Sequence, residues 1–139
     1  MAVTTKKLQL NTKGNDDMID ITGEVSQMVK DSGIKQGTVT VFATGSTAGV
    51  TTIEYESGLE QDMKKLLNDL IPSETNWRHN ATWGEGNGHS HLRASIVGSS
   101  LTVPIVDGSM TLGTWQQIVL IDFDIKARSR DLVLQAIGE

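Results

Sequence analysis

The segment from Ser57 to Ile71 constrains the fold most, because its pattern fits only an amphipathic helix. Ser57 and Glu60 have the spacing of a capping box, in which each side chain accepts a hydrogen bond from the backbone N–H of the other. Pro72 lacks an N–H group and prevents the helix from continuing. The apolar side chains recur every three or four residues and share one helical face; they are Leu59, Met63, Leu66, Leu67 and Leu70.

Strand-like segments lie on both sides of this helix. Residues 4–11 and 18–21 are predicted strands, joined as a hairpin by the turn "NTKGND", and residues 38–44 and 49–56 are a second pair around "GSTAG". A first helix is predicted from an N-cap at Thr22 to a stop at Gly33. A long polar loop over residues 72–88 precedes three further strands, in "SLTVPIV", "TWQQIVLIDFD" and "LVLQAIG". The order of two strands, helix, two strands, helix and three strands predicts an α+β fold with mostly antiparallel pairing.

The composition excludes several classes of protein. The chain has 139 residues and no internal repeat, which suits one domain over residues 1–139. It has no cysteine, so thiolate chemistry and disulfides are excluded. The net charge of −5 argues against nucleic acid as the main partner. The chain also lacks the run of about 18 apolar residues that a membrane-spanning helix needs, and it has no secretory signal, so we expect a cytoplasmic protein.

All three histidines lie in one segment, which ends with "WGEGNGHSHLRAS". On an extended chain His89 and His91 would point to the same side about 6.6 Å apart, close enough to bind one ion. On a helix they would diverge by roughly 200° and could not share it. The preceding glycines favour the extended form, so we expect His79, His89 and His91 to bind a divalent metal, zinc or magnesium. The alternative is that they are polar loop residues, one of which caps a helix beginning near Ser90.

The glycines Gly84, Gly86 and Gly88 permit a second interpretation of this segment. Successive backbone N–H groups in a glycine-rich turn can form a concave nest for an anion. Arg93 could add a charge-assisted clamp on a phosphate oxygen. The alternative is a plain turn whose backbone needs positive φ.

The stretch "ATGSTAGVTTIEYE" carries a second group of candidates. Ser46 and Thr47 offer hydroxyl groups in a small-residue turn, where a substrate can approach the backbone closely. Glu54 on the following strand could act as a general base or a metal ligand. The alternative is a hairpin with a solvated acidic face.

The stretch "GTWQQI" and the basic cluster after it are a third region of interest. Trp115 could stack on an aromatic ring, and Gln116 could donate and accept hydrogen bonds in one plane. A tryptophan in a strand is, however, more often part of the core. Lys126, Arg128 and Arg130 are predicted to form a solvated turn, with steering of an anionic substrate as the alternative.

Four stretches occur in the order found in one protein family: "GSTAGVTTIEYE", "WGEGNGHSHLRAS", "GSSLTVPIVDG" and "LGTWQQIVLIDFD". Together they resemble the YjbQ-like family, whose members are often labelled secondary thiamine-phosphate synthases. The likeness covers the chain from Val39 to Glu139 and departs at Glu85, where members often have aspartate, and in the variable turn "DIKARSR". It implies two small, mostly antiparallel β-sheets with two helices, and a homotrimer packed about a threefold axis.

The resemblance also implies a pocket shared by the histidine-rich loop and the Trp-Gln strand, lined by His79, Asn87, His89, His91, Arg93 and Gln116. The implied activity is a transferase that joins a pyrimidine pyrophosphate to a thiazole phosphate, with Arg93 and the loop amides holding phosphate. His89 and His91 would hold a divalent metal or act as acids, and Trp115 would stack a ring. The alternatives are a metal-dependent hydrolase of a small phosphorylated metabolite, with Glu54 as base, and a non-catalytic trimer that binds a metabolite.

Overall fold

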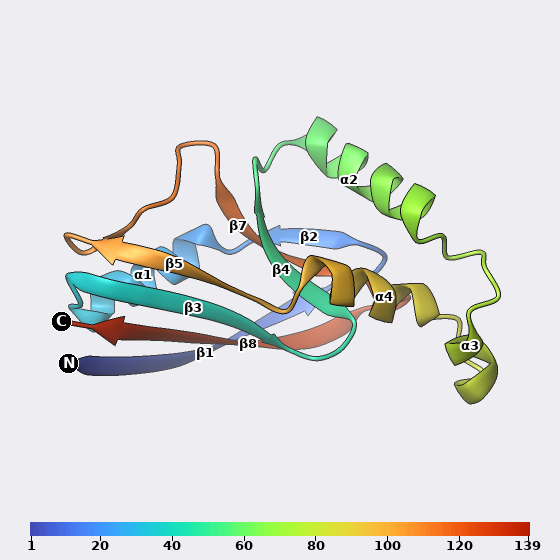
Figure 1. The fold of residues 1–139 in the computed structure, drawn as a ribbon, viewed down its shortest axis with the longest axis horizontal. Helices are drawn as coiled ribbons and strands as arrows, with labels where there is room; N and C mark the ends of the chain where they lie inside the picture. Colours follow the sequence, from blue (N-terminus) through green and yellow to red (C-terminus); the bar gives the residue numbers. More distant parts are fainter.

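The computed structural model describes residues 1–139, and it confirms the α+β class with two antiparallel sheets (Figure 1). The strands are β1 (Ala2–Thr12), β2 (Asp17–Asp20), β3 (Gln36–Thr44), β4 (Ala48–Ile53), β5 (Ser100–Val106), β6 (Ser109–Met110), β7 (Gln117–Asp122) and β8 (Arg128–Gly138). The helices are α1 (Thr22–Ser32), α2 (Ser57–Leu70), α3 (Arg78–Trp83) and α4 (Gly88–Val97). The five-stranded sheet has the order β1-β8-β3-β5-β6, and the three-stranded sheet has the order β2-β7-β4.

The turn after β1 carries the chain from one sheet to the other, so the predicted hairpin of the first two strands is wrong. β1 pairs with β8, whereas β2 pairs with β7. The turn contains Gly14, Asn15 and Asp16, all with positive φ. The turn after β3 makes the same kind of crossing to β4. Both crossings end beside Asp122 at the end of β7, because Asp17 and Ala48 are its partners on the two sides.

β7 is the central strand of the smaller sheet and is buried on both faces. Ile118 and Leu120 belong to the main core, which lies between the two sheets and α1. Val119 and Ile121 point the other way and pack in a second core with residues of α2 and α4. This division follows from the alternation of side chains along a strand. The second core holds α4 against one face of the smaller sheet.

The two predicted helices are confirmed, but their N-caps differ from the prediction. Thr22 is the first residue of α1, and its backbone N–H donates to the Asp20 carboxylate at 2.9 Å. The helix ends at Gly33 with φ 72°, as predicted. The cap of α2 is Glu56 rather than Ser57, and its carboxylate accepts hydrogen bonds from two backbone N–H groups of the first turn. A carboxylate here also opposes the positive end of the helix dipole.

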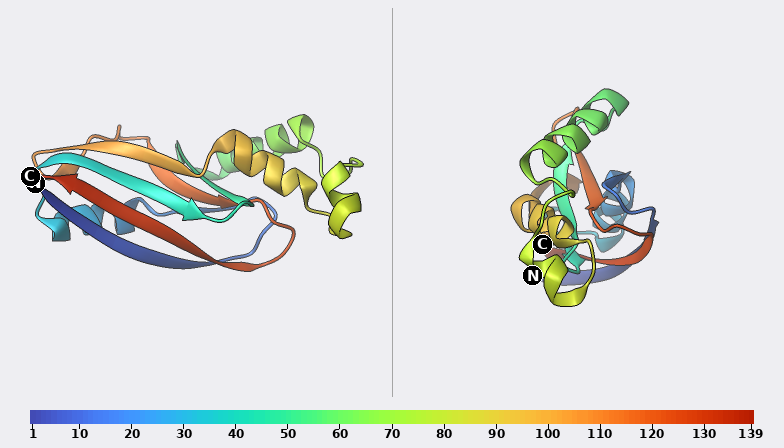
Figure 2. Two further views of the ribbon diagram at one scale, coloured as in Figure 1. Left: turned by 60° about the horizontal axis from the view of Figure 1, so that its bottom comes forward. Right: turned by 90° about the vertical axis from the view of Figure 1, so that its right-hand side faces the viewer.

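The segment predicted to be a long loop instead contains the short helix α3, and α4 follows it directly. The result is four helices where the resemblance implies two. Trp77 Nε1 donates to the Pro72 carbonyl at 2.9 Å, which ties this segment to the end of α2. α3 lies at the end of the molecule opposite to the two chain termini (Figures 1 and 2). None of the four helices has the length and apolar character needed to cross a membrane.

Candidate functional site

His89 and His91 lie in the first turn of α4, so the extended geometry predicted for them is wrong. Residues two apart on a helix point roughly 200° away from each other. His89 turns inward and is 5% exposed. His91 is half-buried and meets His79 of α3, with ring centroids 4.4 Å apart and ring planes at 59°. The three histidines are therefore a near-surface pair and one buried ring.

The glycines before α4 serve packing and turning rather than anion binding. A Cβ on Gly88 would lie 2.7 Å from Trp77 Cβ, so only glycine permits this close approach. The N–H of Gly88 donates to Asn80 Oδ1 at 2.7 Å. Gly84 ends α3 with φ 69°, and its N–H donates to the Asn80 carbonyl. Because two of the three glycine N–H groups are bonded within the chain, the predicted anion nest is not formed.

A metal centre needs several ligands that converge on one point, and one chain does not supply them. No group of three or more His, Asp or Glu side chains is close enough together to hold a metal ion. The direction of His89 separates it from the other two imidazoles. The residues of one chain therefore do not fit the predicted three-histidine zinc or magnesium centre.

His91 has the electrostatics of an unprotonated base. Burial lowers the pKa of His91 below its ordinary value of 6.5, and the neighbouring His79 lowers it further. Weaker attraction from Asp124 and Glu85 acts in the opposite direction. A ring with a lowered pKa is neutral near pH 7, with a nitrogen lone pair available for a proton.

Two hollows meet at His91. One is a cavity of about 280 Å³ between the turn after β3 and the C-terminal half of α4, lined by Gly45, Ser46, Ala48, His91, Ala94, Ser95, Gly98 and Ser99. The other is a wider hollow of about 640 Å³ on the α3 side, and its walls include Trp77, His79 and His91. Cavities of this size suit a small metabolite. We call the first one the serine cavity, after Ser46, Ser95 and Ser99.

Charged side chains fill the interior next to the serine cavity. Asp122 is fully buried and accepts two hydrogen bonds from Arg130, from Nε and from Nη2, each of 2.8 Å. Asp124 is equally enclosed and accepts one from Arg128 Nε at 2.9 Å. The prediction of a solvated turn is wrong for Arg130, because β8 directs this residue into the core. Lys126 is exposed before the strand, and Arg128 at its start is partly exposed.

These pairings control the ionisation of the network. Burial alone would raise the pKa of the Asp122 carboxyl group, but the hydrogen bonds from Arg130 and Thr12 outweigh it and hold the pKa below the ordinary 3.8. The hydrogen bonds also raise the pKa of Arg130. The network is therefore a set of ion pairs near neutral pH.

The network also positions the turn that lines the serine cavity. Thr47 is buried, accepts a hydrogen bond from Arg130 Nη2 at 2.6 Å and donates one to Asp124 at 3.2 Å. Its carbonyl accepts from the Phe123 N–H at 2.9 Å. Ser46 precedes it, is exposed and lines the cavity. Ser46 is thus placed to contact a ligand, whereas Thr47 holds the turn in place.

Arg93 and Asn87 both point inward. Arg93 Nη1 donates to Asp16 at 2.8 Å, while Nε and Nη2 donate to the Ile71 carbonyl at 3.1 and 2.8 Å. The predicted phosphate clamp by Arg93 is not formed, because its guanidinium links α4 to two loops. Asn87 donates to Asp124 at 3.5 Å. Three buried atoms in this region have no hydrogen-bond partner within the chain: Asp16 Oδ1, Asn87 Oδ1 and His89 Nδ1.

Glu54 and the Trp-Gln turn lie at the other end of the smaller sheet. Ile53 pairs with Gln117, five residues along the ladder from the pairing of Ala48 with Asp122. At about 3.3 Å per residue this places Glu54 about 20 Å from the histidine end. Glu54 is exposed and follows the end of β4, so it cannot serve as a base for the histidine pair.

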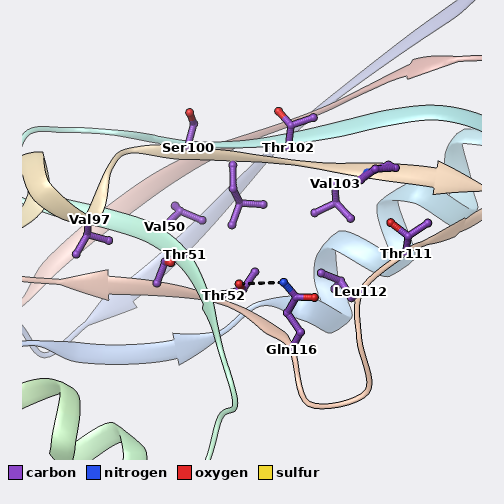
Figure 3. A pocket seen from close by; sticks show the side chains of 12 residues that line it. Val50, Thr51, Thr52, Val97, Ser100, Thr102, Val103, Thr111, Leu112 and Gln116 are labelled. Atoms are coloured by element: carbon purple, nitrogen blue, oxygen red, sulfur yellow. Dashed lines mark hydrogen bonds between the residues drawn. The ribbon is translucent and has the colours of Figure 1, made fainter.

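Trp115 and Gln116 belong to the turn before β7 rather than to the strand. Trp115 is 73% exposed. Gln116 Nε2 donates to Thr52 Oγ1 at 3.2 Å, and its side chain lines a separate hollow of about 340 Å³ between the two sheets (Figure 3). Within one chain, the shared pocket of the histidine loop and the Trp-Gln strand is therefore not formed.

Comparison with known proteins agrees with the sequence motifs. Residues 6–139 match the model of the UPF0047, YjbQ-like family. The chain belongs to this family. A UPF0047 protein of Methanothermobacter thermautotrophicus is 41% identical over 124 residues, which are 89% of this chain and 85% of the relative. The UPF0047 protein YugU of Bacillus subtilis is 34% identical over 135 residues, 96% of this chain and 98% of the relative.

Solved structures of YjbQ-like proteins have the same fold. A YbjQ-like protein of unknown function from Sulfolobus solfataricus superposes with a TM-score of 0.95 at 31% identity, covering 99% of both chains. A hypothetical protein from Aeropyrum pernix gives a TM-score of 0.90 at 30% identity, covering 98% of this chain and 99% of the other. These likenesses confirm the family and the fold, and they assign no activity.

Several residues of this YjbQ-like site were missed from the sequence: Ser95, Ser99, Asp122, Asp124 and Arg130. For the charged ones a signal exists. "IDFD" ends an almost wholly apolar run, and a carboxylate on a buried strand needs a partner. "RSR" supplies two arginines with the same two-residue spacing. For the serines no signal exists, because their role depends on how α4 packs over β4.

Proposed function

We propose that this protein is a small-molecule enzyme that binds an anionic metabolite in the serine cavity and uses the His79–His91 pair for proton transfer. One observation carries the proposal: two half-buried imidazoles lie 4.4 Å apart at the junction of two hollows. Each hollow has room for a small molecule, and His91 borders both. Such an arrangement suits a reaction between two substrates.

The pair supplies both an acid and a base. A charge on His79 disfavours the charged form of His91, because like charges repel. Burial and the neighbouring ring both lower the pKa of His91, so the ring is neutral near pH 7 and its lone pair is free to take up a proton from water. The resulting imidazolium can then give the proton to a leaving oxygen.

The reaction we propose is a transfer of the thiamine-phosphate synthase type between phosphorylated heterocycles. The bond between the pyrimidine methylene carbon and the pyrophosphate oxygen breaks, and pyrophosphate leaves with the electron pair. The thiazole nitrogen forms the new bond to that carbon. Because this nitrogen is already nucleophilic, positioning supplies much of the rate. Support comes from the family resemblance and from the two adjoining hollows, one of which offers Trp77 for ring stacking.

An assay with purified protein tests the reaction. The protein is incubated with both substrates, and thiamine phosphate is quantified by chromatography. We expect turnover in the wild type, a loss of about 100-fold or more in His91→Gln, and near-normal turnover in Gln116→Ala, whose side chain lines a different hollow. Absence of product in the wild type, or full activity in His91→Gln, contradicts the proposal.

Two other functions have less support. A metal-dependent hydrolase needs converging ligands and a nearby acidic base, but no three-ligand group exists in one chain and Glu54 lies at the far end of β4. A non-catalytic metabolite-binding homotrimer would use the same cavity without turnover. Saturable substrate binding without any product, together with a trimeric mass in solution, would favour that third function.

A further inference from the structure

Arg130 has one guanidinium arm that the buried network does not use. Its Nε and Nη2 donate to Asp122, and Nη2 also donates to Thr47. Nη1 makes no hydrogen bond within the chain. The residue is 9% exposed, so the guanidinium is enclosed and its orientation is fixed by Asp122. A fixed arginine with a free N–H pair is a preorganised donor for an oxyanion.

Gly45 lies next to this arm and also lines the serine cavity. A Cβ built on Gly45 would lie 3.1 Å from Arg130 Nη1, and Gly45 itself lines the cavity. Its φ of 150° lies where residues with a side chain are rare. Any larger residue at this position would therefore crowd Nη1. Ser46 and Ser99 border the same cavity and can donate further hydrogen bonds.

The surrounding charges do not repel an anion. Asp122 is paired with Arg130, and Asp124 is paired with Arg128 at 2.8 Å, so the four charges balance. The carbonyl groups after α4 are also occupied, since Gly98 O accepts from Val50 N–H and Ser99 O accepts from Ala43 N–H. A phosphate oxygen entering over Gly45 meets donors rather than free acceptors.

From this geometry we propose that Arg130 Nη1, reached over Gly45, binds a phosphoryl oxygen of the substrate and fixes its anionic end in the serine cavity. The assignment deepens the proposed function and rests on it, because it names the anion-binding group of the same cavity. It also names phosphate and pyrophosphate esters as the ligand class, since their charged oxygens accept strong charge-assisted hydrogen bonds from a guanidinium N–H group.

The test is a titration of the ¹⁵N-labelled protein with inorganic phosphate and pyrophosphate at constant ionic strength, followed by NMR. We expect saturable shifts of the amides of Gly45, Ser46 and Ser99 in the wild type. Gly45→Ala should weaken pyrophosphate binding by about tenfold or more, because a charge-assisted hydrogen bond is lost. Gly86→Ala is the matched control, since a Cβ at Gly86 meets no atom within 4 Å, and its binding should equal that of the wild type.

Arg130→Lys is the second variant, because it keeps a positive charge beside Asp122 but has no second arm to reach the cavity. It should weaken pyrophosphate binding as Gly45→Ala does, provided that circular dichroism shows both variants folded.

Wild-type affinity in both folded variants overturns the assignment of Arg130 while leaving the cavity as the ligand site. Absence of binding to the wild type overturns the assignment and the anionic cavity together. Gly45-dependent pyrophosphate binding without transferase activity keeps the assignment and rejects only the reaction.

Discussion

The two ends of β7 differ sharply, although both lie in the stretch by which the chain resembles its family. At the C-terminal end, Asp122 is fully buried and bonded to Arg130 and Thr12, and the adjoining turn lines the serine cavity. At the N-terminal end, Trp115 is 73% exposed and Gln116 makes a single bond to the neighbouring strand at Thr52. The polar groups at one end of β7 are therefore fixed by packing, whereas those at the other end remain in water. A buried charged group needs a partner in a fixed geometry, whereas an exposed charged group is solvated by water.

Removing the buried carboxylate should have the largest effect. Asp122→Ala leaves the Arg130 guanidinium enclosed without its partner, so we expect the free energy of unfolding to fall by about 3–5 kcal/mol. Urea denaturation followed by circular dichroism measures the change. At the other end of the strand, Gln116→Ala should change the same quantity by no more than about 0.5 kcal/mol, because exposed polar residues contribute little. Equal losses in the two variants would remove the distinction between the ends.

Acidification should weaken the histidine end in two stages. Folding lowers the pKa of His89 and His91, in both cases chiefly through burial, so below 6.5 the unfolded chain binds more protons than the folded one. The free energy of unfolding should therefore fall as the pH drops from 7.5 towards 5. Asp122 and Asp124 also have lowered pKa values, so a second loss should follow below 3.8.

Denaturation curves at a series of pH values test both stages. His89→Gln should retain the loss below 3.8 but have a smaller slope between pH 7 and 5, since one of the two titrating rings is gone. A stability that is constant or rises on acidification from pH 7.5 to 5 would show that the rings are not enclosed as described.

The contact between the His79 and His91 rings should have an effect of intermediate size, on the pKa of His91. His79→Ala removes the neighbouring ring and opens His91 to water, and both changes act to raise the pKa of His91. Titration of the ring proton signals by NMR measures this pKa directly. His89 points away on α4 and should titrate as in the wild type. A fall in the pKa of His91, or an equal change at both rings, would contradict the pairing.

The fold was largely predictable from local pattern, and its largest error concerns the pairing of strands. The α2 helix and the strands β3, β5, β7 and β8 follow from the spacing of their apolar residues. The hairpin of β1 and β2 was a wrong prediction, because a short turn between strands looks the same whether the strands pair or enter different sheets. Only the register beside Asp122 decides this, and register depends on contacts far apart in the sequence.

The site was predictable only as a set of residue types. The histidine-rich segment was the right place to look, and Ser46 and His91 do line one cavity. The inward direction of the His89 and Arg93 side chains was not predictable, because the glycines locally favour an extended chain. Packing against Trp77 and Asn80 instead starts a helix at Gly88. Tertiary contacts thus overrode the local preference, and the helix turned two candidate ligands inward.

The smallest effect on the folded chain is expected at Trp115. Its ring is mostly in water, so Trp115→Ala should change the free energy of unfolding by no more than about 0.5 kcal/mol. Pyrophosphate binding in the serine cavity should also be unchanged, because the turn before β7 lies at the other end of that strand.

The informative measurement for Trp115→Ala is the mass in solution by sedimentation, alongside turnover. An exposed tryptophan is a common anchor of protein interfaces, so a lower mass with unchanged stability would make this turn a contact between copies of the chain. Loss of turnover at unchanged mass would instead show that Trp115 takes part in the reaction, so that both ends of β7 contribute to one active site.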